Sequence, residues 1–298
     1  MSLKIKRTKE DRHAAEQLAV KFPALLIIAN RVASSVFVGA HGRKKVGNGE
    51  AFWQFRRYER GDPIANINWR QSARTDAAFI SEKERENAQS IWLWCDHSLS
   101  MDYNSLKKLP KKNERAVILL LALTCLLCRS GERVALLNSG LSPETGEAAL
   151  FKIFSLLEKN NNLGGNLPRT ELLPRDARVV LISDFFSELA DLEIIINSFA
   201  QNGIKGHLLQ VMDPAEEALR FSGRAEFQGL EGEQSVNVPL VESIRGQYLK
   251  QITTHRTNLI EICQRAGWTF NFHHTHEPPD KALMSLYLAL GKPLNSSF

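Results

Sequence analysis

The chain has 298 residues, 43% hydrophobic and 24% charged, which is ordinary for a soluble globular protein. The net charge of +5 is mildly basic and favours acidic partners or membrane surfaces without identifying either. The longest apolar stretch, residues 116–128, is too short to span a bilayer, and acidic residues interrupt the basic N-terminus, unlike a signal peptide. The four cysteines fit a reducing compartment. We therefore expect a cytoplasmic protein without a membrane span.

The first 89 residues differ in composition from the rest of the chain. Residues 1–34 have apolar side chains at helical spacing, interrupted by Pro23, and predict an N-terminal helical arm. Residues 35–89 mix glycine, arginine and aromatic residues, and we expect a small β-rich subdomain there. Aromatic residues interleaved with arginine also occur in nucleic-acid-binding proteins. Acidic residues dilute the charge of this segment, so no nucleic acid partner is expected.

From residue 90 to residue 298, short apolar runs alternate with helical patterns. Strands are expected at residues 91–95, 133–138, 179–182, 206–212 and 268–272. Helices are expected at residues 113–129, 146–159, 240–266 and 278–290, with another ending near residue 201. A hairpin insertion is expected at residues 225–238. This alternation predicts parallel βαβ units in an α/β domain with a doubly wound, mainly parallel sheet.

Oxygen-bearing side chains follow two of the predicted strands. Asp96, Ser98 and Ser100 come after the first strand, and Asp184 follows the strand at residues 179–182. Ligands of open α/β sheets bind beyond the carboxyl ends of the strands. Together with the amide of Asn166, these groups make a hard oxygen donor set that suits Mg²⁺, Mn²⁺ or Ca²⁺. Aspartate and serine also form turns, and an aspartate at this point can cap the next helix, so these structural alternatives stay open.

The spacing Asp96-x-Ser98-x-Ser100, with Asp184 after a later strand, resembles the metal-ion-dependent adhesion site of von Willebrand factor A domains. That resemblance implies a von Willebrand factor A-like fold and a divalent cation that binds a carboxylate of a partner. In those domains a threonine from a middle loop completes the site. This chain has Asn166 at the position that we align with it.

A second resemblance is carried by the β-rich segment. Its motifs are similar to those of the domain-of-unknown-function family fifty-eight. They are Arg57-Tyr58, Gly61-Asp62, Ile67-Asn68-Trp69 and Ser72-Ala73-Arg74. Members of that family are commonly paired with MoxR-type AAA+ ATPases, which implies such a partner here. The chain departs from the family pattern at Asn66 and Asn68, and it lacks the transmembrane helices that many members carry.

These observations favour a non-enzymatic adaptor that works with a MoxR-type ATPase. It would bind an acidic client protein through a cation held by the five oxygen-bearing residues. The alternative is a metal-dependent hydrolase that uses Asp96 and Asp184, although no nucleophile–base pair is visible. His273, His274 and His276 could suggest zinc, but they lack a cysteine or glutamate at a recognised spacing.

The motif side chains of the β-rich segment have two open interpretations, as packing residues or as a surface for a partner. They are Arg57, Tyr58, Gly61, Asp62, Trp69, Ser72 and Arg74. We also expect Asp62 to pair with one of these arginines.

Overall fold

The computed structural model describes residues 27–36, 52–59, 67–74, 77–83, 89–159, 165–229 and 235–290. The chain divides into two compact units. One unit comprises residues 41–88, and the other comprises residues 1–40 together with residues 89–298.

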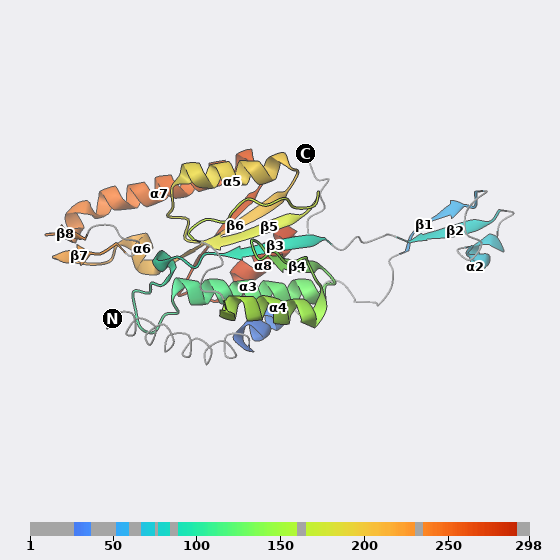
Figure 1. Ribbon diagram of the computed structural model, residues 1–298, viewed down its shortest axis with the longest axis horizontal. Helices are drawn as coiled ribbons and strands as arrows, with labels where there is room; N and C mark the ends of the chain where they lie inside the picture. Colours follow the sequence, from blue (N-terminus) through green and yellow to red (C-terminus); the bar gives the residue numbers. More distant parts are fainter. Residues whose placement is uncertain are drawn as a thin grey trace, which may run out of the picture. The chain divides into compact units, whose positions relative to one another are not determined.

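The larger unit is built on a parallel sheet of five strands, coloured from cyan to red in Figure 1. The strands lie in the order β4-β3-β5-β6-β9, and each neighbouring pair is parallel. Their bounds are β3 Ser90–Cys95, β4 Arg133–Leu136, β5 Arg178–Ser183, β6 Lys205–Met212 and β9 Thr269–His274. The predicted α/β class with a mainly parallel sheet is confirmed.

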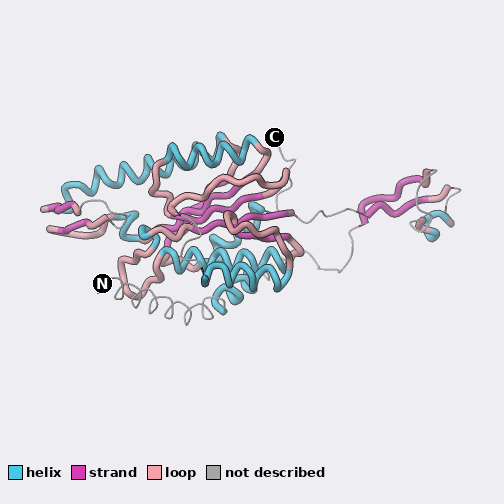
Figure 2. The backbone as a smooth tube through the Cα atoms, viewed as in Figure 1, coloured by secondary structure: helices cyan, strands magenta, loops and turns pink. Residues whose placement is uncertain are grey.

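Helices cover both faces of this sheet, as Figures 1 and 2 show. One face carries α3 (Lys112–Arg129), α4 (Gly146–Lys159) and α8 (Pro279–Leu290), and the helical residues 27–36 share their core. The other face carries α5 (Leu189–Gln201) and α7 (Val241–Arg265). The remainder of the predicted N-terminal arm lies outside the described residues.

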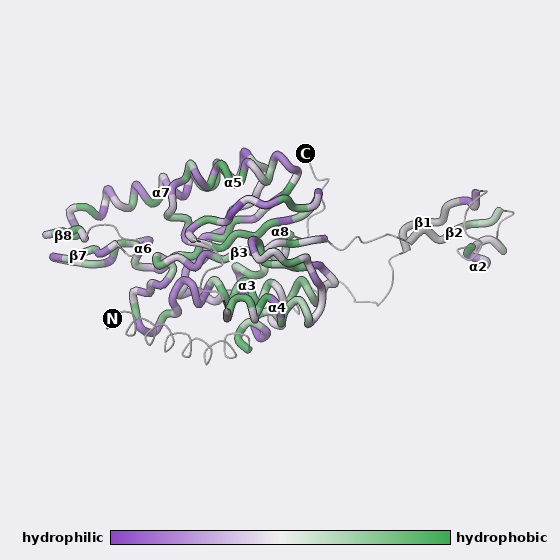
Figure 3. Tube along the Cα trace, viewed as in Figure 1, coloured by the Kyte–Doolittle hydropathy of each residue, from purple (hydrophilic) through white to green (hydrophobic). Residues whose placement is uncertain are grey.

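Successive side chains of a strand point to opposite faces of the sheet, and each face has its own hydrophobic core. In β3, Leu93 packs with the α3 side of the sheet, whereas Trp92 and Trp94 pack with the α5 side. Both faces of the strand are therefore buried, and the strand forms one continuous apolar run. Figure 3 shows the same feature as hydrophobic colouring through the centre of the sheet and along α3.

The strand order reverses between β3 and β5. The chain leaves β3 to form β4 on one side, and it later returns to form β5 on the other side. In doubly wound sheets, a crevice opens outside the carboxyl ends of the strands at this switch point. This topology therefore positions the residues that follow β3 and β5.

A short antiparallel hairpin follows the fourth strand of the sheet. It consists of β7 (Ala225–Phe227) and β8 (Val236–Val238), in the region predicted for a hairpin. Val238 packs with Leu219 and Val241, which anchors the hairpin to the start of α7.

The smaller unit contains β1 (Phe52–Arg57) and β2 (Phe79–Lys83), which pair antiparallel, and the helical turn α2 (Trp69–Ser72). The hydroxyl of Ser72 accepts the backbone N–H of Phe79 at 2.8 Å and so joins α2 to β2. The described part of this unit therefore contains a two-stranded β element and one helical turn.

The structure describes only some of the motif residues that the sequence predicts as packing or partner-surface residues in this unit. Arg57, Trp69 and Arg74 are exposed, with 67% of Trp69 accessible to solvent. Tyr58 is half-buried, and its N–H donates to the carbonyl of Ala78. Gly61 and Asp62 lie outside the described residues, and so does the predicted pairing of Asp62 with an arginine.

Candidate functional site

Three strands of the sheet are each followed directly by a buried aspartate. Asp96 follows β3, Asp184 follows β5 and Asp213 follows β6, and at most 2% of each is exposed. Because parallel strands end at a common edge, the sequence collects these carboxylates at one place.

The oxygens of Asp96 accept two short hydrogen bonds. Oδ1 accepts the backbone N–H of Ser98 at 2.7 Å, and Oδ2 accepts the hydroxyl of Ser183 at 2.6 Å. Burial raises the pKa of Asp96 to about 6, although these hydrogen bonds act in the opposite direction. The hydroxyls of Ser98 and Ser100 lie 3.0 Å apart in the loop that follows. The Asp-x-Ser-x-Ser segment is therefore a tightly bonded turn.

Asp184 is held in a strained turn at the end of β5. Its Oδ1 accepts the N–H of Phe186 at 3.2 Å, and its carbonyl accepts the side-chain amide of Gln210 at 2.9 Å. Phe185 between them is fully buried and has a φ of 54°, in the left-handed region. The helix α5 begins only at Leu189, after Glu188 at its N-cap position, so Asp184 does not cap that helix.

The remaining oxygen of Asp184 binds a lysine. Lys112 is the first residue of α3 and is fully buried, and its Nζ lies 2.8 Å from Asp184 Oδ2. The same Nζ lies 2.6 Å from Oε1 of Glu216. Burial alone lowers the pKa of Lys112, but the two carboxylates together raise it above its usual value. The lysine is therefore a charged ammonium group at neutral pH.

Glu216 is positioned by the short helix α6 (Pro214–Ala218). Asp213 caps this helix by accepting the N–H of Ala215 at 2.8 Å, and Glu216 Oε2 accepts the N–H of Asp213 at 3.1 Å. This is a capping box, with aspartate at the N-cap position. Burial raises the pKa of Glu216, and the neighbouring ammonium of Lys112 opposes that effect. The box leaves Oε1 of Glu216 directed at the lysine.

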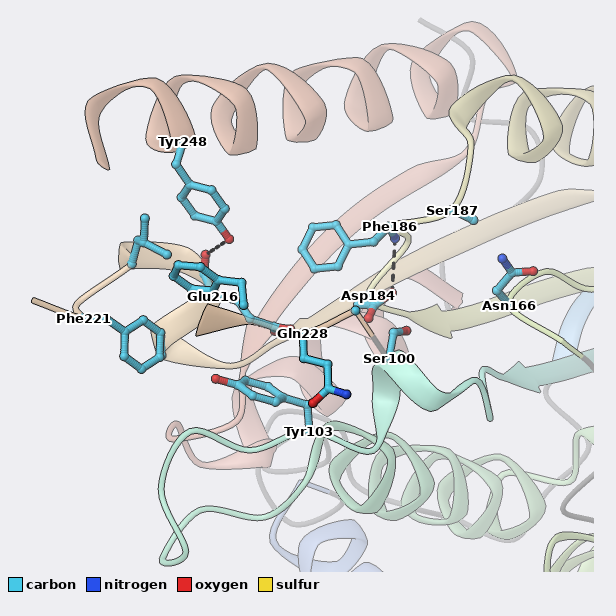
Figure 4. Close-up of a pocket in the computed structure, with 14 residues that line it drawn as sticks. Ser100, Tyr103, Asn166, Asp184, Phe186, Ser187, Glu216, Phe221, Gln228 and Tyr248 are labelled. Atoms are coloured by element: carbon cyan, nitrogen blue, oxygen red, sulfur yellow. Dashed lines mark hydrogen bonds between the residues drawn. The ribbon is translucent and has the colours of Figure 1, made fainter. Parts of the chain in front are cut away.

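A cavity of about 330 Å³ opens beside these groups (Figure 4). Figure 4 shows Asn166 at one end of the cavity and Phe221 and Tyr248 at the other. Five of the fourteen residues that line the cavity are aromatic. They are Tyr103, Phe186, Phe221, Phe227 and Tyr248.

The predicted metal ligands meet this cavity only in part. Ser100, Asp184 and Asn166 line it, and the side chain of Asn166 is exposed. Asp184, however, has the ammonium of Lys112 at hydrogen-bond distance, and a divalent cation bound there would face a unit positive charge at close range. The residues present therefore fit an ammonium group better than a divalent cation.

Sequence reasoning missed Lys112 and Glu216 as members of this site. A signal for Lys112 is present, because it lies four residues before Ala116 and seven before Leu119, on the buried face of α3. A lysine on the apolar face of a helix needs a buried carboxylate partner. Glu216 carries the Asp-Pro-x-Glu capping pattern, which marks a helix start but not the lysine that the glutamate binds.

The histidines near the end of β9 differ in their surroundings. His273 is buried, and His274 Nε2 lies 2.8 Å from Glu217 Oε2, which also binds Arg256. Among the described residues, no three His, Cys, Asp or Glu side chains are grouped so as to hold a metal ion.

Comparisons with known proteins give distant relatives and structural neighbours. An uncharacterized protein of Mycobacterium bovis is 22% identical over 266 residues, covering 84% of this chain and 83% of that protein. The conserved hypothetical protein BatB from Bacteroides thetaiotaomicron is 12% identical, with a TM-score of 0.43 over 69% of this chain and all of that one. An aerotolerance-related membrane protein from Bacteroides fragilis is 15% identical, with a TM-score of 0.40 and the same coverage. The SpRpn10 VWA domain is 9% identical, with a TM-score of 0.29 over 71% of this chain and 98% of that one.

The cytoplasmic location expected from the sequence is contradicted by the description of one of these neighbours as a membrane protein. That expectation is wrong because a lack of apolar spans and a few free cysteines do not determine where a protein resides. In the part of the chain that the structure describes, no helix has the length and apolar character needed to cross a membrane.

A family model matches residues 54–258, which is more than half of the chain, and its description is "Protein of unknown function DUF58". The match includes residues 54–89 of the β-rich segment, the three aspartates at the sheet edge and most of α7. The chain belongs to this family.

Proposed function

We propose that this chain is a non-enzymatic protein-interaction module that docks a partner protein at the cavity beside Asp184 and Glu216. The observation that carries the proposal is the cavity itself. It lies at the switch point of the sheet, where ligands of doubly wound folds bind, and five aromatic side chains line it. Pockets of this kind receive the anchor residues of protein partners.

The exposure of the lining supports docking. Phe186 and Phe221 are each 39% exposed although both are large apolar side chains. Leu99, in the loop that follows β3, is 63% exposed near the same edge of the sheet. Apolar groups that remain accessible around a concave site favour an interaction surface.

The resemblance to the family suggests which partner docks. We propose that a MoxR-type AAA+ ATPase is the partner, acting with this chain on a further client protein. No observation among the described residues favours the hydrolase alternative, in which Asp96 and Asp184 hold a catalytic metal.

The proposal is tested by placing a photoreactive phenylalanine at position 221 and irradiating the cells that produce the chain. A matched control places the same group at Phe151, which lies on α4 and is 71% exposed. We expect a covalent adduct from position 221 and not from position 151, with a MoxR-type ATPase identified in it by mass spectrometry. An adduct with an unrelated protein contradicts the choice of partner, and equal labelling at both positions contradicts docking at the cavity.

A further inference from the structure

We infer that the ammonium group of Lys112 is the resident cation of this site, and that the site works without a divalent metal ion. The Asp-x-Ser-x-Ser segment and the later aspartate suggest a metal site in the sequence. In the folded chain, a side chain supplies the positive charge instead.

The geometry of the ammonium group supports this assignment. Nζ lies 2.8 Å from Asp184 and 2.6 Å from Glu216, which are distances of charge-assisted hydrogen bonds. The ring centroids of Phe186 and Tyr103 lie 5.4 Å and 5.8 Å from the same atom. Aromatic faces at these distances stabilise an ammonium ion, so carboxylates and rings together surround the charge.

The position of Lys112 is held by the backbone as well as by the side chain. The N–H of Lys112 donates to the carbonyl of Tyr103 at 3.1 Å, which ties the start of α3 to the loop after β3. None of the lysine is accessible to solvent. The helix start therefore delivers the charge to the sheet edge as a built-in part of the fold.

A divalent cation would compete poorly for the same carboxylate. Mg²⁺ demands oxygen ligands at 2.0–2.1 Å in octahedral geometry and gives up its water reluctantly. It would also be repelled by the fixed ammonium, and a site of low polarity strengthens that repulsion. A lysine at this place needs no octahedral set of oxygen ligands and meets no second cation, because its charge is tethered to the chain.

If Lys112 is the resident cation, the proposed docking site contacts its partner differently from a metal site. A metal ion would offer an open coordination position to a carboxylate of the partner, whereas the hydrogen bonds of Lys112 are directed at Asp184 and Glu216. In this respect the inference rests on the proposed docking, and it predicts a contact made by the aromatic lining instead of by a bridging metal. The ion chemistry itself holds whether or not a partner docks there.

The first experiment titrates Mn²⁺ into the metal-stripped full chain and follows free Mn²⁺ by electron paramagnetic resonance. We expect no saturable site at micromolar to millimolar concentrations, and we expect Asp96→Ala to behave like the unmodified chain. One-to-one binding that is lost in Asp96→Ala would overturn the inference. This measurement does not depend on whether any lysine variant folds.

The second experiment compares Lys112→Ala with Lys111→Ala by urea denaturation. Lys111 is the neighbouring lysine, and it forms an exposed ion pair with Asp102 at 2.7 Å, so it is a matched control. We expect the urea midpoint to fall in Lys112→Ala and to rise again when propylammonium is added, with neither effect in Lys111→Ala. Indistinguishable behaviour of the two variants would overturn the inference.

A third comparison separates this inference from the proposed function. The cross-link from position 221 is repeated in Asp96→Ala with Mg²⁺ left unchanged, because an ATPase partner needs Mg²⁺ for its own nucleotide, and we expect the same yield as from the unmodified chain. A cross-link that is lost in Asp96→Ala overturns the inference and leaves docking intact. If no cross-link forms, docking fails, and the Mn²⁺ titration still decides the ion chemistry.

Discussion

At the edge of the sheet, the stability of the fold depends strongly on Lys112. A buried ion pair gains little net stability when it forms, because both charges lose water. Removal of one partner, however, leaves an uncompensated buried charge and costs about 3–5 kcal/mol. Exposed pairs such as Lys111–Asp102 contribute only about 0–1 kcal/mol. The two lysine variants are therefore expected to differ clearly in stability although the residues are adjacent.

The buried His273 makes the free energy of unfolding depend on pH. Burial, with smaller effects from Arg115, His274 and His276, lowers the pKa of His273 to about 3, whereas an unfolded histidine titrates near 6.5. Between these values the unfolded chain binds a proton that the folded chain does not bind. The free energy of unfolding therefore falls as the pH drops below about 6.5, by up to about 1.4 kcal/mol per pH unit from this residue.

The test measures urea denaturation between pH 4.5 and pH 7.5 for His273→Gln. We expect a shallower decline of stability below pH 6.5 than in the unmodified chain. His276 is exposed and is the matched control, since His276→Gln should keep the steeper decline. An unchanged slope in His273→Gln contradicts the prediction.

At the scale of elements, β6 depends on a close approach to the loop before β9. A Cβ added to Gly206 would overlap the ring of Trp268. That ring is buried, stacks on Phe199 and donates its indole N–H to the carbonyl of Ile204 at 3.0 Å. The ring cannot move aside without losing these contacts, so glycine is required at this position of the strand.

We therefore expect Gly206→Ala to lower the free energy of unfolding by about 1–3 kcal/mol, the usual effect of overpacking. Gly246 in α7 is the control, because a Cβ there meets no other atom within 4 Å. Alanine favours helices more than glycine does, so Gly246→Ala should raise stability by up to about 1 kcal/mol. Equal effects of the two substitutions on the urea midpoint would contradict this account.

At the scale of the whole molecule, the chain divides into two compact units. Among the described residues, the three hydrophobic clusters of the larger unit contain no side chain from residues 41–88. Helical residues 27–36, by contrast, contribute Ala29, Val32, Ala33 and Val36 to the core around α3. The described core of the larger unit is therefore assembled from residues that precede and follow the smaller unit in the sequence.

We predict that replacing residues 41–88 with a flexible glycine–serine linker leaves the larger unit folded. Its urea midpoint, followed by the fluorescence of Trp92, Trp94 and Trp268, should match that of the full chain, since independent units unfold separately. A large drop in the midpoint, or loss of cooperative unfolding, would show that the smaller unit supports the larger one.

The sequence by itself determined the elements of the sheet unit and their class. Apolar runs that end in polar residues located β3 and β5, and helical periodicity located α4 at residues 146–159 with the bounds that the structure has. These signals are local, because burial on one face or on both faces sets the period of apolar residues within each segment. The meeting of Asp96 and Asp184 at one edge also followed, since parallel connections bring the carboxyl ends of strands together.

Only the tertiary structure decided the chemistry at that edge. The sequence predicted a helix from residue 113 and treated Lys112 as part of its charged flank, whereas α3 begins at Lys112 and buries it completely. The lysine is separated by 72 residues from Asp184 and by 104 residues from Glu216. A motif of carboxylates and hydroxyls carries no information about which cation balances it. Packing of α3 against the sheet places an ammonium there, because a buried charge is stable only beside its partners.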